Sequence, residues 1–358
     1  MSIKETVNNV HSHWMDGMGP ESEVIVSSRV RVARNLANRP FSHLLSETDA
    51  REIIHSVMLV TENEELRSQV GTLELTEMNE LTPVERQILV EKHLISPDLL
   101  ENHLKKAVVL REDEVISIMV NEEDHLRLQC LLPGLQLKEA WDLINKLDDG
   151  LEKKLEYAYH ENLGYLTACP TNVGTGLRAS VMLHLPGLVM INRIKDVLGL
   201  VSKLGLAVRG LYGEGTEASG NLFQVSNQVT LGQTEEDIIN SLISVAGQIA
   251  ASEMAAREAL IRERREHLED RVGRAFGLLS NARIMTSEEA VRLLSDLRLG
   301  VSLKMIDFIP ANLVTELMVM IRPAFLVKKA EKDLSSFARD VMRAGLIREK
   351  LTGKGICN

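Results

Sequence analysis

The sequence has little of what marks secreted, membrane-spanning or nucleic-acid-binding proteins. Its 358 residues include only three cysteines, far apart and odd in number, so a disulfide framework is not expected. No apolar run approaches the ~20 residues of a membrane span, and the first residues lack the apolar region of a signal peptide. The formal net charge of −10 argues against a nucleic-acid binder. These absences favour a cytoplasmic globular protein that binds neither membrane nor nucleic acid.

The two commonest ATP-site motifs are also missing. The sequence has no P-loop pattern GxxxxGK[ST], and it has neither of the HRD and DFG motifs. What it has is a run of arginines, in Ser27-Ser28-Arg29-Val30-Arg31, within an acidic chain. On a strand Arg29 and Arg31 point to the same face. Two guanidinium groups repel each other unless an anion lies between them, so this stretch predicts an anion site.

The pattern of apolar residues predicts an α+β domain followed by an all-α domain. Antiparallel-style strands are expected at 24–34, 106–111, 115–121, 125–131, 163–168, 178–185, 205–211 and 221–229. Helices are expected at 47–63 (capped by Ser46), 84–93, 137–157, 187–204, 234–278, after Thr286, after Pro310 and at 328–344. The division predicted is an N-terminal arm at 1–20, a first domain at 21–260 and a helical domain at 261–358.

Three more stretches gather ionisable residues beside turns. They are Asn121-Glu122-Glu123-Asp124-His125-Leu126-Arg127, the segment 169–180 (CPTNVGTGLRAS) and the segment 208–217 (VRGLYGEGTE). Glycines in the last two allow a backbone to approach a ligand closely. Each stretch alone also fits an ordinary role: a solvated turn for the first, a small core residue for Cys169, and a hairpin turn for the third. No single motif decides the function.

Taken in order, the four stretches resemble the catalytic domain of the phosphagen (guanidino) kinases, which transfer the γ-phosphoryl group of ATP to a guanidine. The resemblance covers about residues 24 to 260 and is most specific in the CPTN and RAS strings. It implies an antiparallel sheet flanked by helices. It also implies ATP and Mg²⁺ as cofactors, with arginines in place of a P-loop lysine and no metal site built from protein side chains.

The resemblance also implies roles for individual residues. The nucleotide phosphates would meet Arg29, Arg31, Arg127, Arg178 and Arg209. Other nucleotide-site positions would be Ser27, Ser28, Val30, His93, Ala179, Ser180, Val181, Met182, Gly210, Leu211, Tyr212 and Gly213. Glu123 and Glu214 would hold the acceptor guanidinium beside Cys169, with Glu122 as a further catalytic candidate. Met182 and Met119 stand where metabolic members usually have histidine and tryptophan.

The last part of the chain narrows the resemblance to the bacterial protein arginine kinases. Arg339-Asp340-Val341-Met342-Arg343-Ala344 forms an RDxxRA string, and in that group the helical domain uses this motif to bind phosphoarginine. Arg339 and Arg343 are neighbours at i, i+4 on a helix. The string alone favours a solvated charged face, and it is the kinase-like first domain that favours the binding role. Metabolic members carry a helical lid domain ahead of the SSRVR strand, where this sequence has only residues 1–23. A protein arginine is therefore the expected acceptor.

The sequence thus predicts an ATP:protein-arginine phosphotransferase that marks proteins for stress-response regulation and degradation. Implied partners are a heat-shock repressor as substrate, a zinc-binding activator protein, an unfoldase–protease that reads the mark, and further copies of the chain in a homo-oligomer. Two alternatives remain: a metabolic arginine or creatine-type kinase acting on a free guanidino compound, and a non-catalytic phosphoarginine-binding adaptor. Intact Glu123, Glu214 and Cys169 argue against the adaptor.

Overall fold

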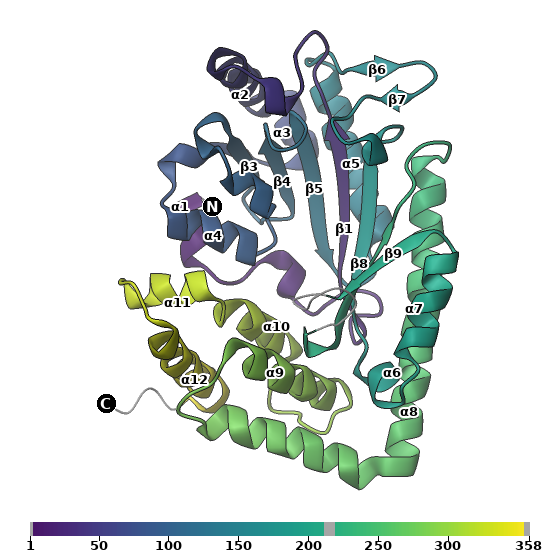
Figure 1. The fold of residues 1–358 in the computed structure, drawn as a ribbon, viewed down its shortest axis with the longest axis vertical. Coiled ribbons are helices and arrows are strands. Elements are labelled where there is room, and N and C mark those ends of the chain that lie inside the picture. The colour runs from purple at the N-terminus through teal and green to yellow at the C-terminus, as the bar shows by residue number, and fades with distance from the viewer. Residues whose placement is uncertain (1–2, 211–218, 354–358) are drawn as a thin grey trace.

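The computed structural model describes residues 3–210 and 219–353, and its centre is an antiparallel sheet (Figure 1). The eight strands of this sheet follow the order β2-β3-β4-β5-β1-β8-β10-β9, and every neighbouring pair is antiparallel. They are β1 Ile25–Arg34, β2 Leu73–Glu77, β3 Ala107–Arg111, β4 Ile116–Val120, β5 Leu126–Pro133, β8 Leu177–His184, β9 Leu206–Gly210 and β10 Leu222–Asn227. A separate hairpin pairs β6 Tyr159–His160 with β7 Gly164–Tyr165.

Helices cover the sheet and form the last third of the chain. The first group comprises α1 Ile3–Asn8, α2 Glu47–Thr61, α3 Glu64–Val70, α4 Pro83–Glu91, α5 Leu137–Glu152, α6 Pro186–Met190 and α7 Ile194–Lys203. The second comprises α8 Glu235–Asn281, α9 Ser287–Ser302, α10 Ala311–Met320, α11 Pro323–Ala330 and α12 Ser336–Thr352. The expected α+β class with a helical C-terminal region is confirmed.

The alternation of β1 builds a core on one face of the sheet. Val30 and Val32 are fully buried there, in one cluster with residues of α2, α5 and the first half of α8, such as Ile53, Ile144 and Leu242. Burying an aliphatic side chain of this size stabilises the fold by about 1.5–3 kcal/mol. The opposite face of β1 carries Arg29 and Arg31 and is left partly open.

A second core joins the sheet to the helical part. Val26 of β1 and Leu131 of β5 belong to the same buried cluster as Leu89 of α4, Leu294 of α9 and Leu317 of α10. Figure 1 shows the helical part below the sheet, with α9 and α10 next to the lower strand ends. The helical part therefore packs on the sheet and is not a tethered appendage.

Helix α8 connects the two parts and changes direction once. A capping box between Thr234 and Asp237 starts it, and the backbone at Arg264 is non-helical, with φ −146° and ψ 40°. Its first stretch runs alongside the sheet and its second runs beneath α9 and α12 (Figure 1). An 18-residue window of α8, with mean hydropathy 1.2, is long and apolar enough to cross a membrane by length and composition alone. A buried core helix passes the same test, and Ile239, Leu242 and Ile249 of α8 lie in the sheet core.

Several expected elements differ in the structure. The expected strand at 163–168 is reduced to Gly164–Tyr165 in the separate hairpin, and the expected helix at 187–204 is split into α6 and α7. The expected helix at 328–344 is wrong: Glu331 takes a left-handed conformation that ends α11, and Ser335 caps α12. Residues 1–20 were expected to form a polar arm, but Val7 and Trp14 are buried. The expected strand at 24–34 and the Ser46 cap of the 47–63 helix are confirmed.

Candidate active site

Strand register gathers the five expected phosphate arginines on one face of the sheet. Arg31 of β1 lies opposite Arg178 of β8 and opposite Gln129 of β5. Side chains two residues apart on a strand share a face, so Arg29 and Arg127 join them. Met182 shares the face of Arg178 on β8 and lies opposite Gln224 of β10, which in turn lies opposite Arg209 of β9. Arg209 is therefore the fifth arginine on this face. Five guanidinium groups from four strands thus converge.

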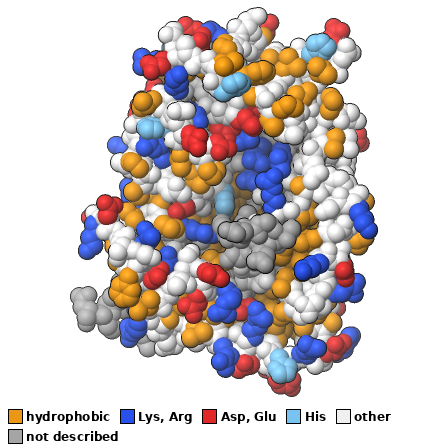
Figure 2. All heavy atoms as spheres, in the orientation of Figure 1, with side chains coloured by type: hydrophobic (Ala, Val, Ile, Leu, Met, Phe, Trp, Pro, Cys, Tyr) orange, Lys and Arg blue, Asp and Glu red, His pale blue; other side chains and the backbone are white. Residues whose placement is uncertain are grey.

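These arginines line a cleft of about 690 Å³. Its other walls come from α4, from the loop after it and from the start of α11, and include Glu91, His93, Asp98, Gln129, Gly210, Gln224, Arg322 and Pro323. Figure 2 shows basic and acidic side chains gathered next to one another near the middle of this face. A hollow of this size and charge is suited to a polyanionic ligand.

The cleft arginines crowd one another. Burial first, and then the charges of Arg127 and Arg178, lower the pKa of Arg29 to about 10. Burial also lowers the pKa of Arg31 well below its usual value, with neighbouring arginines adding to the effect. Among the residues that the structure describes, the buried Nε atoms of Arg31 and Arg178 find no hydrogen-bond partner. A bound anion would accept hydrogen bonds from these unpaired donors and reduce the repulsion among the arginines.

The remaining expected nucleotide residues divide between the two faces. Ser27, Ser180 and Met182 border a small hollow together with Arg29 and His93, on the arginine side. Four others point away from the cleft, because neighbouring positions of a strand face opposite sides of the sheet. These four are fully buried: Ser28, Val30, Ala179 and Val181. Only the backbone of these four could meet a ligand in the cleft. Leu211, Tyr212, Gly213 and Glu214 lie outside the described residues.

His93 follows α4 and lies against Trp14, with ring centroids 5.5 Å apart. Its backbone is left-handed, with φ 61°. Burial first, then the charges of Arg29 and Arg322, lower the pKa of the His93 imidazole to about 3. The ring is therefore neutral at physiological pH, and it can stack or hydrogen-bond without adding to the positive charge of the cleft.

Glu122 and Glu123 have different environments at the edge of the cleft. Glu122 is buried; its Oε1 accepts from Arg127 Nη1 at 2.6 Å and from Ser96 Oγ, and its Oε2 accepts from the Glu123 amide. Glu123 is 40% exposed, with its carboxylate 3.5 Å from Arg127. Partial burial raises the pKa of Glu123, which makes it a better proton acceptor. Glu122 thus fixes Arg127, while Glu123 faces outward.

An adjoining hollow of about 580 Å³ extends the site on the side of these glutamates. It is bordered by Asp98, Glu101, Glu122 and Glu123, together with Lys105 and Lys106. Asp98 lines both this hollow and the arginine cleft. A cationic group could therefore reach Glu123 from here while an anion occupies the arginines.

Cys169 is half-buried at the start of the 3-10 turn Pro170–Asn172. Its sulfur lies 3.0 Å from Thr171 Oγ1. Cys169 is a lesser influence on Arg178, whose pKa it raises, so these two side chains lie near each other. The structure thus places Cys169 near the expected phosphate arginines.

The RDxxRA residues lie away from the cleft, on α12. Arg343 is buried and donates to the carbonyl oxygens of Ile321 and Met285 at 3.1 and 2.9 Å, and to Asp340. Arg339 is half-buried, and its Nη1 donates to the Leu334 carbonyl at 3.5 Å. Ala344 is buried. Arg343 thus has a structural role that the sequence did not reveal.

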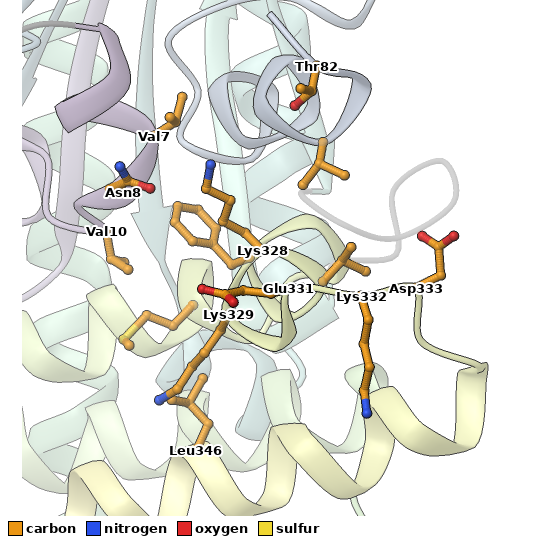
Figure 3. Close-up of a pocket in the computed structure, with 14 residues that line it drawn as sticks. Val7, Asn8, Val10, Thr82, Lys328, Lys329, Glu331, Lys332, Asp333 and Leu346 are labelled. Carbon is orange, nitrogen blue, oxygen red and sulfur yellow. The ribbon is translucent and has the colours of Figure 1, made fainter.

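A larger hollow, of about 970 Å³, is lined in part by residues of α11 (Figure 3). Its walls combine apolar and charged side chains from α1, α4, α11 and α12, such as Val7, Val84, Lys328 and Leu346. None of the five cleft arginines borders it. Its size does not make it the reaction site, since it lacks the arginines with unpaired buried donors that line the cleft.

Sequence reasoning missed several cleft residues, among them Gln129, Gln224 and Arg322. Gln224 accepts from Arg29 Nη2 at 2.9 Å, and strand register would have placed it once β8 and β10 were paired. Arg322 comes from the helical part, and its position depends on tertiary packing that no local pattern reports.

Two family models together match most of the chain. The ATP:guanido phosphotransferase C-terminal catalytic domain matches residues 52–256. The Protein-arginine kinase McsB C-terminal domain matches residues 265–355. The matches meet near the bend of α8 at Arg264.

Curated relatives and solved structures agree with these matches. A protein-arginine kinase of Pelotomaculum thermopropionicum is 65% identical over 350 residues, which is 98% of either chain. One from Desulforamulus reducens is 61% identical over 351 residues, again 98% of either chain. Among solved structures, a lombricine kinase is similar with a TM-score of 0.58 and 25% identity, over 68% of this chain and 70% of that one.

Proposed function

The chain belongs to the ATP:guanido phosphotransferase family and, within it, to the protein-arginine kinases, and we propose that the arginine cleft is where it transfers the γ-phosphoryl group of ATP to an arginine side chain of another protein. The observation that carries this proposal is the cleft itself: five arginines on one sheet face, two with buried, unpaired Nε donors. The carboxylate of Glu123 at its edge supplies the group that an acceptor guanidinium requires.

The arginines bind and neutralise the phosphates. A phosphoryl transition state spreads negative charge over its equatorial oxygens, so fixed guanidinium groups that are already desolvated stabilise it. Planar guanidinium forks also match pairs of phosphate oxygens. Arg127 is fixed by Glu122, and Arg29 by Gln224 and Ser180, so these groups need little rearrangement to bind.

The acceptor guanidinium is a cation that must lose a proton to become a nucleophile. In the proposed step one guanidinium nitrogen attacks the γ-phosphorus, its proton passes to a carboxylate, a P–N bond forms, and the P–O bond to the departing ADP breaks. Glu123 is placed to orient the guanidinium and to take up the proton. By resemblance to the family, Glu214 shares this role and Cys169 lies beside the acceptor.

Mg²⁺ fits this proposal as a ligand of the nucleotide. In the part of the chain that the structure describes, no group of three or more His, Cys, Asp or Glu side chains could hold a metal. Mg²⁺ commonly keeps several waters and binds through substrate phosphates, where it lowers the repulsion between them. The cleft arginines then share the phosphate oxygens with it.

The test is phosphorylation of a loosely folded, arginine-containing protein. The chain is incubated with ATP and Mg²⁺, and the products are analysed by mass spectrometry under conditions that preserve acid-labile groups. We expect phosphoarginine on the protein substrate, and an Arg31→Gln variant should produce much less. Free L-arginine serves as the competing acceptor. Phosphorylation of free arginine alone would favour a kinase of small guanidino compounds, and no phosphoarginine in either would contradict the assignment.

The cellular setting follows from the resemblance and remains part of the proposal. We propose a cytoplasmic enzyme whose mark serves stress-response regulation and protein degradation. Its partners would be a heat-shock repressor, a zinc-binding activator, an unfoldase–protease and further copies of the chain. We also propose that Arg339 and Asp340 take part in binding phosphoarginine on the helical part. The half-buried guanidinium of Arg339 supports this, because it is accessible while Arg343 is not.

A further inference from the structure

One arginine of the helical part lines the same cleft as the five arginines of the sheet. Arg322 and Pro323, at the start of α11, border the cleft beside Gln87 and Glu91 of α4. Arg322 therefore approaches the anion site from a part of the chain that the catalytic-domain family model does not cover, since that match ends at residue 256.

The electrostatic neighbours of Arg322 place it on the nucleotide side of the cleft. Its charge is one of three causes that lower the pKa of His93, after burial and Arg29. It also lowers the pKa of Glu91, although burial of Glu91 dominates and raises that pKa to about 7. On the acceptor side, Arg322 is not among the groups that shift the pKa of Glu123.

Helix α11 is docked firmly enough to hold Arg322 in place. The Glu91 carboxylate accepts from the backbone amides of Ala324 and Phe325 at 3.0 and 3.4 Å. Farther along the same pair of helices, Lys328 Nζ lies 2.9 Å from Glu85. On the other side of Arg322, the carbonyl of the preceding residue accepts from Arg343. The backbone at residue 322 is thus fixed from both sides.

A sixth guanidinium in the cleft adds a positive charge that can bind a phosphate oxygen of a polyanion. We propose that Arg322 binds the polyphosphate of the nucleotide, so that the helical part completes a binding site that the sheet alone leaves open. This inference rests on the proposed assignment of the cleft to ATP. A purely structural role, in which Arg322 serves only as the counter-ion of Glu91, is the competing explanation.

The test compares nucleotide affinity in full-length variants. Calorimetry measures binding of Mg·ATP and Mg·ADP to the wild type, Arg322→Gln, Arg322→Lys and Glu91→Gln, and thermal unfolding reports folding of each. Losing a charge-assisted hydrogen bond predicts about tenfold weaker binding or more for Arg322→Gln. Arg322→Lys keeps the charge and should recover part of the affinity. The control is Arg292→Gln, an exposed arginine of α9 outside the cleft, which should bind like the wild type.

Kinetics separate binding from chemistry. We expect Arg322→Gln to raise the KM for ATP, with kcat at saturating ATP changed by much less and the KM for the protein substrate unchanged. Equal affinity of the wild type and Arg322→Gln for both nucleotides overturns the inference. A parallel loss of stability in Arg322→Gln and Glu91→Gln without loss of affinity would establish the structural role. Because affinity is measured without turnover, these results stand even if the wild type phosphorylates no protein arginine.

Discussion

The arginine side chains of the cleft must meet two opposing requirements. The arginines must be desolvated and close together to neutralise a polyphosphate, yet burial and mutual repulsion lower the pKa of Arg29, Arg31 and Arg178. Glu122 offsets part of that repulsion at Arg127, and Gln224 holds Arg29 without adding charge. The cleft therefore has an excess of positive charge, which the phosphates of a nucleotide can balance.

Glu123 and its neighbour Glu122 should therefore respond differently to the same substitution. Glu123→Gln removes the outward carboxylate, so phosphoryl transfer should fall by about a hundredfold or more while ATP affinity stays close to that of the wild type. Glu122→Gln should weaken ATP binding as well, because Arg127 loses its buried partner. Calorimetry with Mg·ATP and a phosphoarginine assay measure both effects. Activity of Glu123→Gln within a few-fold of the wild type would contradict the role of Glu123.

His93 makes folding sensitive to acid. Its pKa of about 3 lies below the ~6.5 of an imidazole in an unfolded chain, so protonation favours unfolding. Its contribution to stability is present above about pH 6.5 and is lost as the pH falls toward 3. His93→Asn removes the titrating ring and tolerates the left-handed backbone. The Tm should fall less between pH 7 and about pH 4.5 in this variant than in the wild type.

The exposed His160 provides the matched control for this measurement. His160→Asn should keep the Tm difference of the wild type across the same pH interval. An undiminished acid sensitivity of His93→Asn would show that other groups, such as the remaining carboxylates, account for the loss of stability at low pH.

At the scale of elements, packing gives the two arginines of the RDxxRA motif different environments. Both arginines of the RDxxRA string lie on α12. Arg343 donates hydrogen bonds to the backbone carbonyl oxygens of Ile321 and Met285, whereas Arg339 stays accessible. A buried carbonyl that loses its donor costs about 1–3 kcal/mol. The two arginines are therefore not interchangeable.

Arg339→Ala should abolish binding of free phosphoarginine to the chain and leave the Tm almost unchanged. Arg343→Ala should lower the Tm, because two buried carbonyl oxygens lose their donor. Calorimetry with phosphoarginine and thermal unfolding of each variant separate ligand binding from stability. Unchanged phosphoarginine binding by Arg339→Ala would remove Arg339 from the proposed site.

The sequence was most informative where local pattern and tertiary structure agree. Alternation in 24–34 predicted that Arg29 and Arg31 share a face, and the structure has them so. The break between α11 and α12 was missed, because Glu331 adopts a left-handed backbone that few non-glycine residues take. Arg322 was missed for a different reason: it reaches the cleft only because α11 docks on α4, more than two hundred residues away in sequence.

At the scale of the whole molecule, the helical part is needed to cover the sheet. Val26, Met119 and Leu131 of the sheet share their core with Leu294 and Leu317 of the helical part. Removing that part would expose apolar surface larger than a soluble monomer usually tolerates.

A chain that ends at Arg264, where α8 bends, should therefore be poorly soluble and should bind Mg·ATP more weakly than the full chain. Expression of both forms, followed by size-exclusion chromatography and calorimetry, measures solubility, association and affinity. A monodisperse, soluble truncated chain with the ATP affinity of the full chain would show that the sheet does not depend on the helical part.

The shared core also bears on how the protein melts. Two parts joined by a flexible linker would unfold in separate steps, but parts that bury their side chains against each other lose those contacts together. Heat should then produce one cooperative transition, in which the calorimetric and van't Hoff enthalpies agree. Catalysis and the proposed phosphoarginine binding would be lost over the same narrow temperature range, so partial heating would leave no population of chains with one activity and without the other.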